Sequence, residues 1–272
     1  MQRRPAGALW GLWLMLVGMT GCAADLPRLD GPARLERGLI VILPGIEGNS
    51  RWNRDIALGL DQGGVTSAIR IDDWTNGLPG SYVYTLAHLE RNQQEARRIA
   101  AMIESYRDEC PGRPVHLIGH SGGAGMAVLT LEALAEETRI ATAFLLAPAL
   151  SPEYDLSPAL RRVHQLVYSF YSEEDVALLK IGTSIFGSID RQHEAAAGAT
   201  GFITPAEGDT QTEALYSERL RQVAWGPSLE RYGADGTHFG WASLQFARTY
   251  LAPIIVHNEA HWSARRVNKI QD

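Results

Sequence analysis

A serine with glycines on both sides follows a short apolar run in the stretch VHLIGHSGGAG, residues 115–125. The apolar residues predict a buried strand, and the small residues after the serine predict the start of a helix. Around Ser121, the glycines at positions 119 and 123 complete the pattern G-x-S-x-G, in which a sharp turn between strand and helix presents the hydroxyl for nucleophilic attack. The turn also places Ser121 at a helix N-terminus, where backbone N–H groups favour developing negative charge. We therefore predict that Ser121 is a nucleophile.

Other glycine-rich motifs do not fit this stretch. A dinucleotide fingerprint needs G-x-G-x-x-G, but Ser121 occupies the position of the second glycine. A phosphate-binding P-loop needs a lysine before its last residue, and the stretch has none. The remaining alternative is an ordinary tight turn that happens to contain a serine.

Strand and helix patterns alternate along the rest of the chain. Continuous apolar runs predict strands buried on both faces of a parallel sheet, and apolar residues with a helical period predict the helices between them. We expect strands at 38–45, 66–71, 115–119, 140–150, 165–172 and 201–207, and helices at 49–64, 92–106, 122–137 and 239–255. This alternation predicts one α/β domain over residues 39–256, with a mostly parallel sheet and helices on both faces. Residues 257–272 are expected to form a polar C-terminal tail.

From about Gly38 to Ile255 the chain resembles the α/β-hydrolase family, because GHSGG matches the nucleophile elbow of its esterase and lipase members. The resemblance implies the chain order serine, acid, histidine. Asp175, in the turn after a predicted strand, is then the expected acid, with Glu173 and Glu174 as alternatives. His238, in a glycine-rich loop before the last helix, is the expected base. Such a histidine takes the proton of the serine, and the carboxylate fixes its tautomer.

The same resemblance implies that two backbone N–H groups stabilise the negatively charged oxygen of the tetrahedral intermediate. Gly122, directly after the nucleophile, is the expected first donor. Ile46, in the loop LPGIEGNS after the first strand, is the expected second donor, with Glu47 as the alternative. The Glu47 carboxylate must then point away, since a negative charge beside the oxyanion would oppose catalysis.

The first residues have the composition of an export signal. Arg3 and Arg4 precede an apolar run at 8–19, which has the length of a signal-peptide core and is too short to cross a bilayer. The sequence MTGC, ending at Cys22, resembles the lipobox of bacterial lipoproteins. This implies a signal peptide at residues 1–21 and a lipid on Cys22. Simple cleavage nearby, with a soluble secreted product, is the alternative.

The location of the mature protein follows from the same resemblance. Residues 22–38 contain prolines and alternating charges, so we expect an extended tether between the lipid and the domain. Ala23 stands where lipoproteins retained in the inner membrane often have aspartate, which favours the outer membrane. The expected location is therefore the bacterial cell envelope, with periplasmic or secreted protein as the alternative.

Charge and composition exclude several other classes of partner. Without residues 1–21, which hold two arginines and no acid, 23 basic and 31 acidic residues remain, so the net charge is −8. An acidic domain without a basic cluster is a poor partner for nucleic acid. His257 and His261 match neither order of a zinc helix, and we expect no metal and no organic cofactor. With Cys22 lipidated, Cys110 has no cysteine partner.

These observations favour a serine hydrolase that cleaves carboxylic esters through an acyl-enzyme on Ser121. The expected partners are a small-molecule or lipid ester substrate and, through the lipid anchor, a membrane. An amidase or an acyltransferase would need the same residues. A non-catalytic binding module of the envelope on the same scaffold is the alternative from another class.

Overall fold

A six-stranded sheet forms the centre of the computed structural model, which describes residues 29–75, 88–175, 196–204 and 210–271. Its order is β2-β1-β3-β4-β5-β6, and every neighbouring pair is parallel. The strands are β1 (Leu39–Leu43), β2 (Ala68–Ile71), β3 (Val115–His120), β4 (Thr142–Leu146), β5 (Val167–Tyr171) and β6 (Leu220–Ala224). The predicted α/β fold with a parallel sheet is confirmed.

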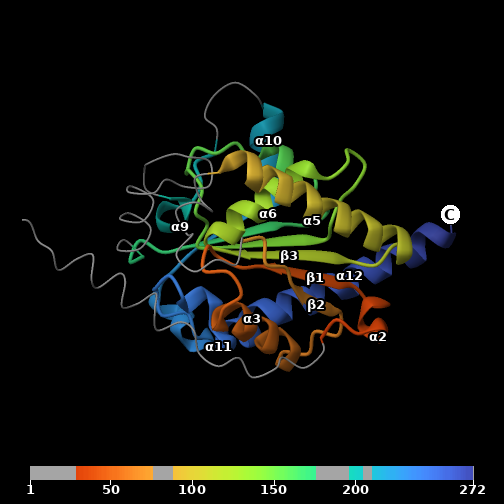
Figure 1. Cartoon of the computed structure of the whole chain (residues 1–272), viewed down its shortest axis with the longest axis horizontal. Helices are drawn as coiled ribbons and strands as arrows, with labels where there is room; N and C mark the ends of the chain where they lie inside the picture. The colour runs from red at the N-terminus through yellow and green to blue at the C-terminus, as the bar shows by residue number, and fades with distance from the viewer. Residues whose placement is uncertain (1–28, 76–87, 176–195, 205–209, 272) are drawn as a thin grey trace, which may run out of the picture.

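Helices cover both faces of this sheet, with α5 and α6 on one side and α3, α11 and α12 on the other (Figure 1). The α-helices are α2 (Pro32–Leu35), α3 (Arg51–Gln62), α5 (Leu89–Glu109), α6 (Gly122–Ala133), α7 (Ser157–Leu160), α9 (Ala197–Thr200), α10 (Thr210–Arg219), α11 (Leu244–Phe246) and α12 (Ala252–Gln271). The shorter 3₁₀ and π segments are η1 (Pro227–Tyr232), η2 (Gly240–Ala242) and η3 (Ala247–Leu251).

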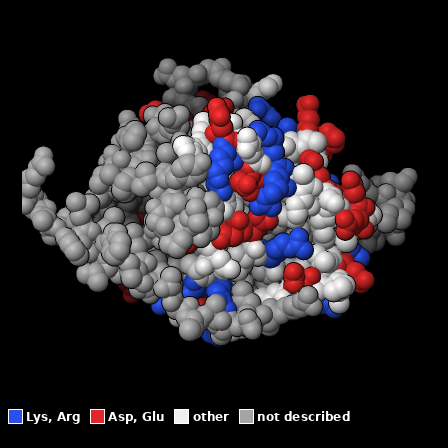
Figure 2. All heavy atoms as spheres, in the orientation of Figure 1, with Lys and Arg blue, Asp and Glu red and all other residues white. Residues whose placement is uncertain are grey.

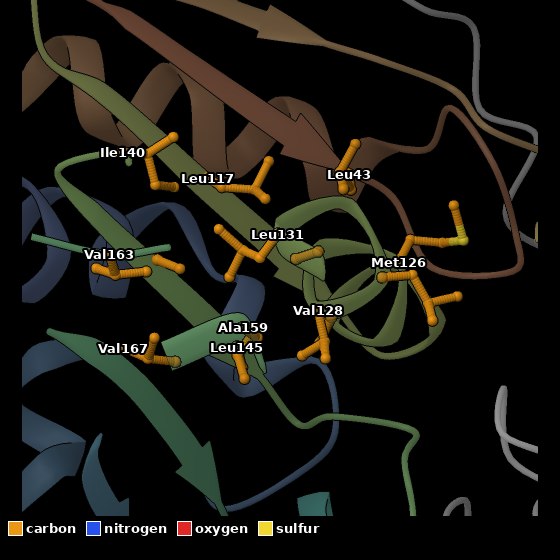
Figure 3. Packing of buried hydrophobic residues seen from close by; sticks show 14 of the residues in the cluster. Leu43, Leu117, Met126, Val128, Leu131, Ile140, Leu145, Ala159, Val163 and Val167 are labelled. Atoms are coloured by element: carbon orange, nitrogen blue, oxygen red, sulfur yellow. The ribbon is translucent and has the colours of Figure 1, made fainter. Parts of the chain in front are cut away.

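The alternation of side chains along each strand divides the core into two layers. On β3, Leu117 packs in the layer under α5 and α6, whereas Ile118 packs in the layer against α3 and α12. Figure 3 shows Leu117 beside Leu131 of α6 in the first layer. Helix α6 is buried from Gly122 to Leu131, which explains why its sequence is apolar on every side.

The last strand lies elsewhere than expected. Residues 201–204 form no strand, and the rest of the expected 201–207 segment lies outside the described residues. Strand β6 instead uses the sequence LRQVA at the edge of the sheet, where its side chains are half-buried or exposed. The side chain of Gln222 makes hydrogen bonds of 2.6 and 2.8 Å with the backbone N–H and C=O of Phe202. The expected segment is therefore held beside the sheet by a side chain and does not join its ladder.

Residues 29–38 pack onto the domain, although the sequence predicts an extended tether here. Arg34 donates hydrogen bonds to Asp61 and to the backbone oxygens of Val65 and Ser67. Leu29 is buried, and its carbonyl accepts a hydrogen bond from the N–H of Ile69 in the edge strand β2. These contacts satisfy polar groups at the edge of the sheet, which an extended tether would leave open.

The segment expected as a polar tail continues the last helix, since α12 runs to Gln271. Its inner side holds polar contacts with the sheet: Asn258 donates to Thr142 Oγ1 at 3.0 Å, and Ser67 donates to Glu259. Among the helices that the structure describes, none has the length and apolar composition needed to cross a bilayer.

Acidic and basic side chains are mixed on the face of the molecule that Figure 2 shows. Arg98 of α5 illustrates the pattern, because its guanidinium forms ion pairs with Asp72 and Glu95. Charges of opposite sign that lie this close cancel at a distance, so the described part of this face presents no large field of one sign.

Candidate active site

Ser121 occupies a strained turn between β3 and α6. Its φ of 55° and ψ of −120° are rare for any residue with a side chain. Hydrogen bonds fix this backbone: the N–H of Ser121 donates to Leu146 at 2.8 Å, and the carbonyl of Ser121 accepts from Ala149 at 3.2 Å. Strain of this kind persists only where the surroundings enforce it, and it is common at active sites.

Two glycines make this turn possible because no side chain would fit at either position. A Cβ at Gly119 would overlap the backbone of Gly123, and a Cβ at Gly123 would overlap the carbonyl oxygens of Leu43 and Pro44. The start of α6 thus lies directly against the end of β1. This close approach explains both glycines of the G-x-S-x-G pattern.

Asp175 and His238, which are 63 residues apart, form a buried hydrogen-bonded pair. Asp175 Oδ2 lies 2.7 Å from Nδ1 of His238, and the two residues are only 4% and 6% exposed. The neighbouring Glu173 and Glu174 are exposed and line a cavity of about 300 Å³ together with Trp225. Of the three acids that the sequence offers, the structure brings Asp175 to His238.

His120 links this pair to the turn that carries Ser121. Its Nε2–H donates to the backbone carbonyl of His238 at 3.0 Å, and the two imidazole rings lie 4.8 Å apart between centroids. Ser121 is therefore the direct neighbour of a residue that contacts His238. Sequence analysis gave His120 no role, because no local pattern indicates its partner 118 residues away.

The residues of the two expected oxyanion donors are in contact with each other. A Cβ placed on Gly122 would be 2.9 Å from Ile46 Cγ2 and 3.7 Å from the Ile46 nitrogen. The loop of Ile46 is held by Trp74, a fully buried residue whose indole N–H donates to Pro44 at 2.7 Å. Sequence analysis missed Trp74, because only its contact with the loop, 30 residues away in the chain, indicates its role.

Glu47 turns its side chain back along its own loop. Its carboxyl covers Gly45, where a Cβ would collide with Oε2, and it accepts a hydrogen bond from Ser50 at 3.3 Å. Burial raises the pKa of Glu47, while hydrogen bonds and the nearby His238 act in the opposite direction. The Glu47 carboxyl thus makes these contacts within its own loop.

Other expectations concern a lipid and a metal. Cys22 lies outside the described residues. In the part of the chain that the structure describes, no three His, Cys, Asp or Glu residues are grouped so that they could hold a metal ion. His257 and His261 pack edge to face, with their ring centroids 4.3 Å apart.

A parallel sheet with a strained serine between a central strand and a buried helix defines the α/β-hydrolase fold. The family model described as serine aminopeptidase, S33, matches residues 35–198, which is more than half of the chain. The chain therefore belongs to this family of α/β hydrolases.

Several solved structures are similar to this chain at very low sequence identity. The chain is similar to Est1E from Butyrivibrio proteoclasticus, with 12% identity over 85% of this chain and 92% of that one, and a TM-score of 0.52. Est1E with bound ferulic acid gives 15% identity over 87% and 94%, and a TM-score of 0.51. An esterase from Pyrobaculum calidifontis gives 12% identity over 96% and 95%, with a TM-score of 0.42. No curated protein matches the sequence.

Proposed function

We propose that the protein is a serine hydrolase that cleaves carboxylic esters through an acyl-enzyme on Ser121. The observation that carries this proposal is the strained backbone of Ser121, fixed next to the buried Asp175–His238 pair through the contact of His120. A serine in an ordinary turn would have no need of this conformation, whose energetic cost is about 1–3 kcal/mol.

Each residue has one role in the proposed reaction. Because Asp175 engages Nδ1 of His238, the other ring nitrogen, Nε2, is left to take the proton from Ser121. The Ser121 oxygen then bonds to the ester carbonyl carbon, and the C–O bond to the alcohol breaks as His238 returns the proton to that alcohol. Water, activated in the same way, releases the acid and restores the serine.

The negative charge of each tetrahedral intermediate needs fixed donors. The backbone N–H groups of Gly122 and Ile46 are the proposed pair, and the contact between these two residues supports the assignment. The position of Glu47 supports this assignment, since its carboxyl is occupied by Gly45 and Ser50. Removing a single donor of this kind typically costs 10²–10³-fold in kcat.

The bond that is cleaved distinguishes two candidates. The likeness to Est1E, which was solved with bound ferulic acid, supports an ester, because a carboxylic acid is the acyl product of ester hydrolysis; the description of the family as serine aminopeptidase supports an amide. Ester and amide hydrolysis, and acyl transfer to an alcohol, would all pass through the same acyl-enzyme. We place the ester first because an alcohol leaves the tetrahedral intermediate that precedes the acyl-enzyme more easily than an amine does.

A fluorophosphonate probe tests the shared first step. We expect mass spectrometry to find the probe on Ser121 in the wild-type protein, no label in Ser121→Ala, and full labelling of Ser67→Ala. A short p-nitrophenyl ester and an amino-acid p-nitroanilide then separate esterase from aminopeptidase, and added alcohol reveals acyl transfer. A wild-type protein that neither binds the probe nor cleaves either substrate would be a non-catalytic binding module.

We further propose that a lipid on Cys22 anchors the enzyme in the bacterial cell envelope, with the outer membrane favoured. The support comes from the sequence: the arginines at 3 and 4, the apolar run at 8–19 and the MTGC motif. A diacylglyceryl group with an N-acyl chain would supply more than the two signals that stable anchoring takes. Metabolic labelling with a fatty-acid analogue tests this directly, with Cys22→Ser as the unlabelled control.

A further inference from the structure

The polar contacts of His120 lead from the nucleophile to the base. His120 ends β3, directly before Ser121, and its ring is completely buried between the strand and the loop that carries His238. A carbonyl oxygen can only accept a hydrogen bond, so Nε2 of His120 must carry the proton in its 3.0 Å bond to the backbone of His238. The geometry therefore fixes the tautomer of His120.

The charge of His120 is fixed as well. Burial, together with the positive charge that His238 can carry, lowers the pKa of His120 to about 3. The ring thus remains a neutral N–H donor at every pH at which the enzyme is expected to work. Neutrality matters here, because a second cation 4.8 Å from His238 would oppose the imidazolium that forms during catalysis.

The base is held at two points. Asp175 holds the ring of His238 at Nδ1, and His120 holds its backbone at the carbonyl oxygen. With the ring contact alone, the loop could shift while the Asp175 bond survived, and the distance from His238 to Ser121 would change. A displacement of about 1 Å at reacting groups can cost 10²-fold in rate.

We propose that His120 is a positioning residue, which sets the position of His238 relative to Ser121 through its Nε2–H bond to the His238 backbone. This role rests on the proposed function, since it matters only if Ser121 and His238 react. His120 would act through His238, without contact to the substrate. Its contribution should therefore fall on kcat and leave KM nearly unchanged.

His116 provides a matched control on the same strand. It lies four residues before His120 on the same face of β3 and is also completely buried. Unlike His120, neither of its ring nitrogens has a hydrogen-bond partner among the described residues, and its nearest charged group is Glu259, 3.8 Å away. Replacing His116 thus disturbs the strand and its burial without touching the loop of His238.

The experiment compares two substitutions at each position. His120→Phe keeps a ring of similar size but removes the donor, whereas the amide of His120→Gln can donate from nearly the same place as Nε2. With a short p-nitrophenyl ester, we expect kcat to fall about 10- to 100-fold in His120→Phe. We expect a loss of less than about fivefold in His120→Gln, a KM within about threefold of wild type in both, and a normal kcat in His116→Phe and His116→Gln.

A signal that is independent of turnover completes the test. The proton between His238 Nδ1 and Asp175 gives a low-field resonance in the NMR spectrum of imidazole-labelled protein. It should be present in the wild type and in His120→Gln, and shifted or lost in His120→Phe. If His120→Phe does not fold, His120→Leu replaces it, with the same comparison to His120→Gln.

Several results would overturn the proposal. They are an unchanged kcat and resonance in His120→Phe, an equal loss in the Phe and Gln variants, or an equal loss at positions 116 and 120. Failure of the proposed function looks different, because the wild-type protein itself would then show neither probe labelling nor hydrolysis. The resonance would in that case still decide whether His120 positions His238.

Discussion

Strand β3 carries two completely buried histidines with opposite surroundings. At its carboxyl end, His120 contacts a loop and precedes the strained Ser121. At its amino end, His116 faces Glu259 of α12, which also accepts a hydrogen bond from Ser67. Burial alone therefore does not distinguish the proposed positioning histidine, His120, from His116. The two differ in the element that each side chain contacts. Loops at the carboxyl ends of parallel strands hold ligands and chemistry, as is general for α/β sheets.

The polar groups at the amino end fasten the last helix to the sheet. Thr142 of β4 bonds to Gln165 at 2.8 Å and to Asn258 of α12 at 3.0 Å, and Gln165 donates to the Asn258 backbone at 3.1 Å. Each of these bonds contributes about 1 kcal/mol to stability. Substitutions at the two ends of the sheet should therefore have separable effects, on catalysis at one end and on stability at the other.

The largest expected effect is that of removing the proposed nucleophile. Ser121→Ala should lower kcat for a short p-nitrophenyl ester by about 10⁴-fold or more, because the members of such a triad act as a unit. The matched change at the opposite end, Ser67→Ala, should leave kcat within about twofold and lower the free energy of unfolding by about 1 kcal/mol, since Glu259 loses a donor. Steady-state kinetics and urea unfolding measure both, and full activity in Ser121→Ala would remove Ser121 from the mechanism.

The carboxyls beside the two ends give the next comparison. Asp175→Asn should lower kcat by about 10²–10⁴-fold with little change in stability, because the amide no longer holds the correct tautomer of His238. Glu259→Gln, beside His116, should leave kcat within about twofold. A comparable loss in Glu173→Gln or Glu174→Gln, with Asp175→Asn active, would contradict the assignment of the acid.

The acid sensitivity of stability sharpens the comparison further. Burial lowers the pKa of His116 to about 3, whereas an unfolded histidine titrates near 6.5, so the unfolded chain binds this proton first as the pH falls. The stability that depends on a neutral His116 is present above pH 6.5 and is lost as the pH falls toward 3. Replacing His116 by Phe should therefore remove about 2 kcal/mol of the wild-type loss between pH 6.5 and 5.

Urea unfolding of wild type and His116→Phe at matched pH values measures this difference. Parallel curves would contradict the expectation and would indicate that Glu259 pairs with a charged His116 in the folded protein. Burial raises the pKa of Glu259, so Glu259→Gln in the same series shows how much this neighbour contributes.

The smallest expected change in activity follows from removal of the proposed anchor. Cys22→Ser should move the protein from the membrane fraction to the soluble fraction while kcat per molecule stays within about twofold of wild type, because the contacts that position Ser121 and His238 lie within the sheet domain and do not involve Cys22. Fractionation and esterase assays measure both quantities. Membrane retention of Cys22→Ser would point to an uncleaved N-terminal segment, and release with loss of activity would favour a lipase that needs the membrane.

Local patterns predicted the central strands of this fold and one edge strand, β2, but not the other edge strand, β6. The strands β1, β3 and β4 are buried along their whole length, so their sequences are mostly apolar, even though β3 includes two histidines. Strand β6 lies at the edge and carries Arg221 and Gln222, which leaves neither an apolar run nor a clean alternation. The edge contacts of Leu29 could not be predicted from a local pattern either, because they join segments that are 40 residues apart.

The candidate site shows the same limit. A short motif identifies Ser121, because strand, turn and helix follow one another in the chain. The choice of Asp175 over Glu173 and Glu174 depends on which side chain of one turn faces inward, and three consecutive acids carry no signal for that. The contact of His120 with His238 is set by tertiary packing alone.

The packing of residues 29–38 sets the distance at which a lipid-anchored form would work. Only Ala23 to Arg28 separate Cys22 from Leu29, which contacts the sheet, and an extended chain spans at most about 3.6 Å per residue. The distance from Cys22 to Leu29 is therefore at most roughly 25 Å, which is less than the diameter of a domain of this size. An enzyme anchored in this way would meet esters of the same membrane by diffusion in two dimensions. The rate of these encounters would depend on the number of ester molecules per unit area of membrane, and dilution of the surrounding fluid would not change it.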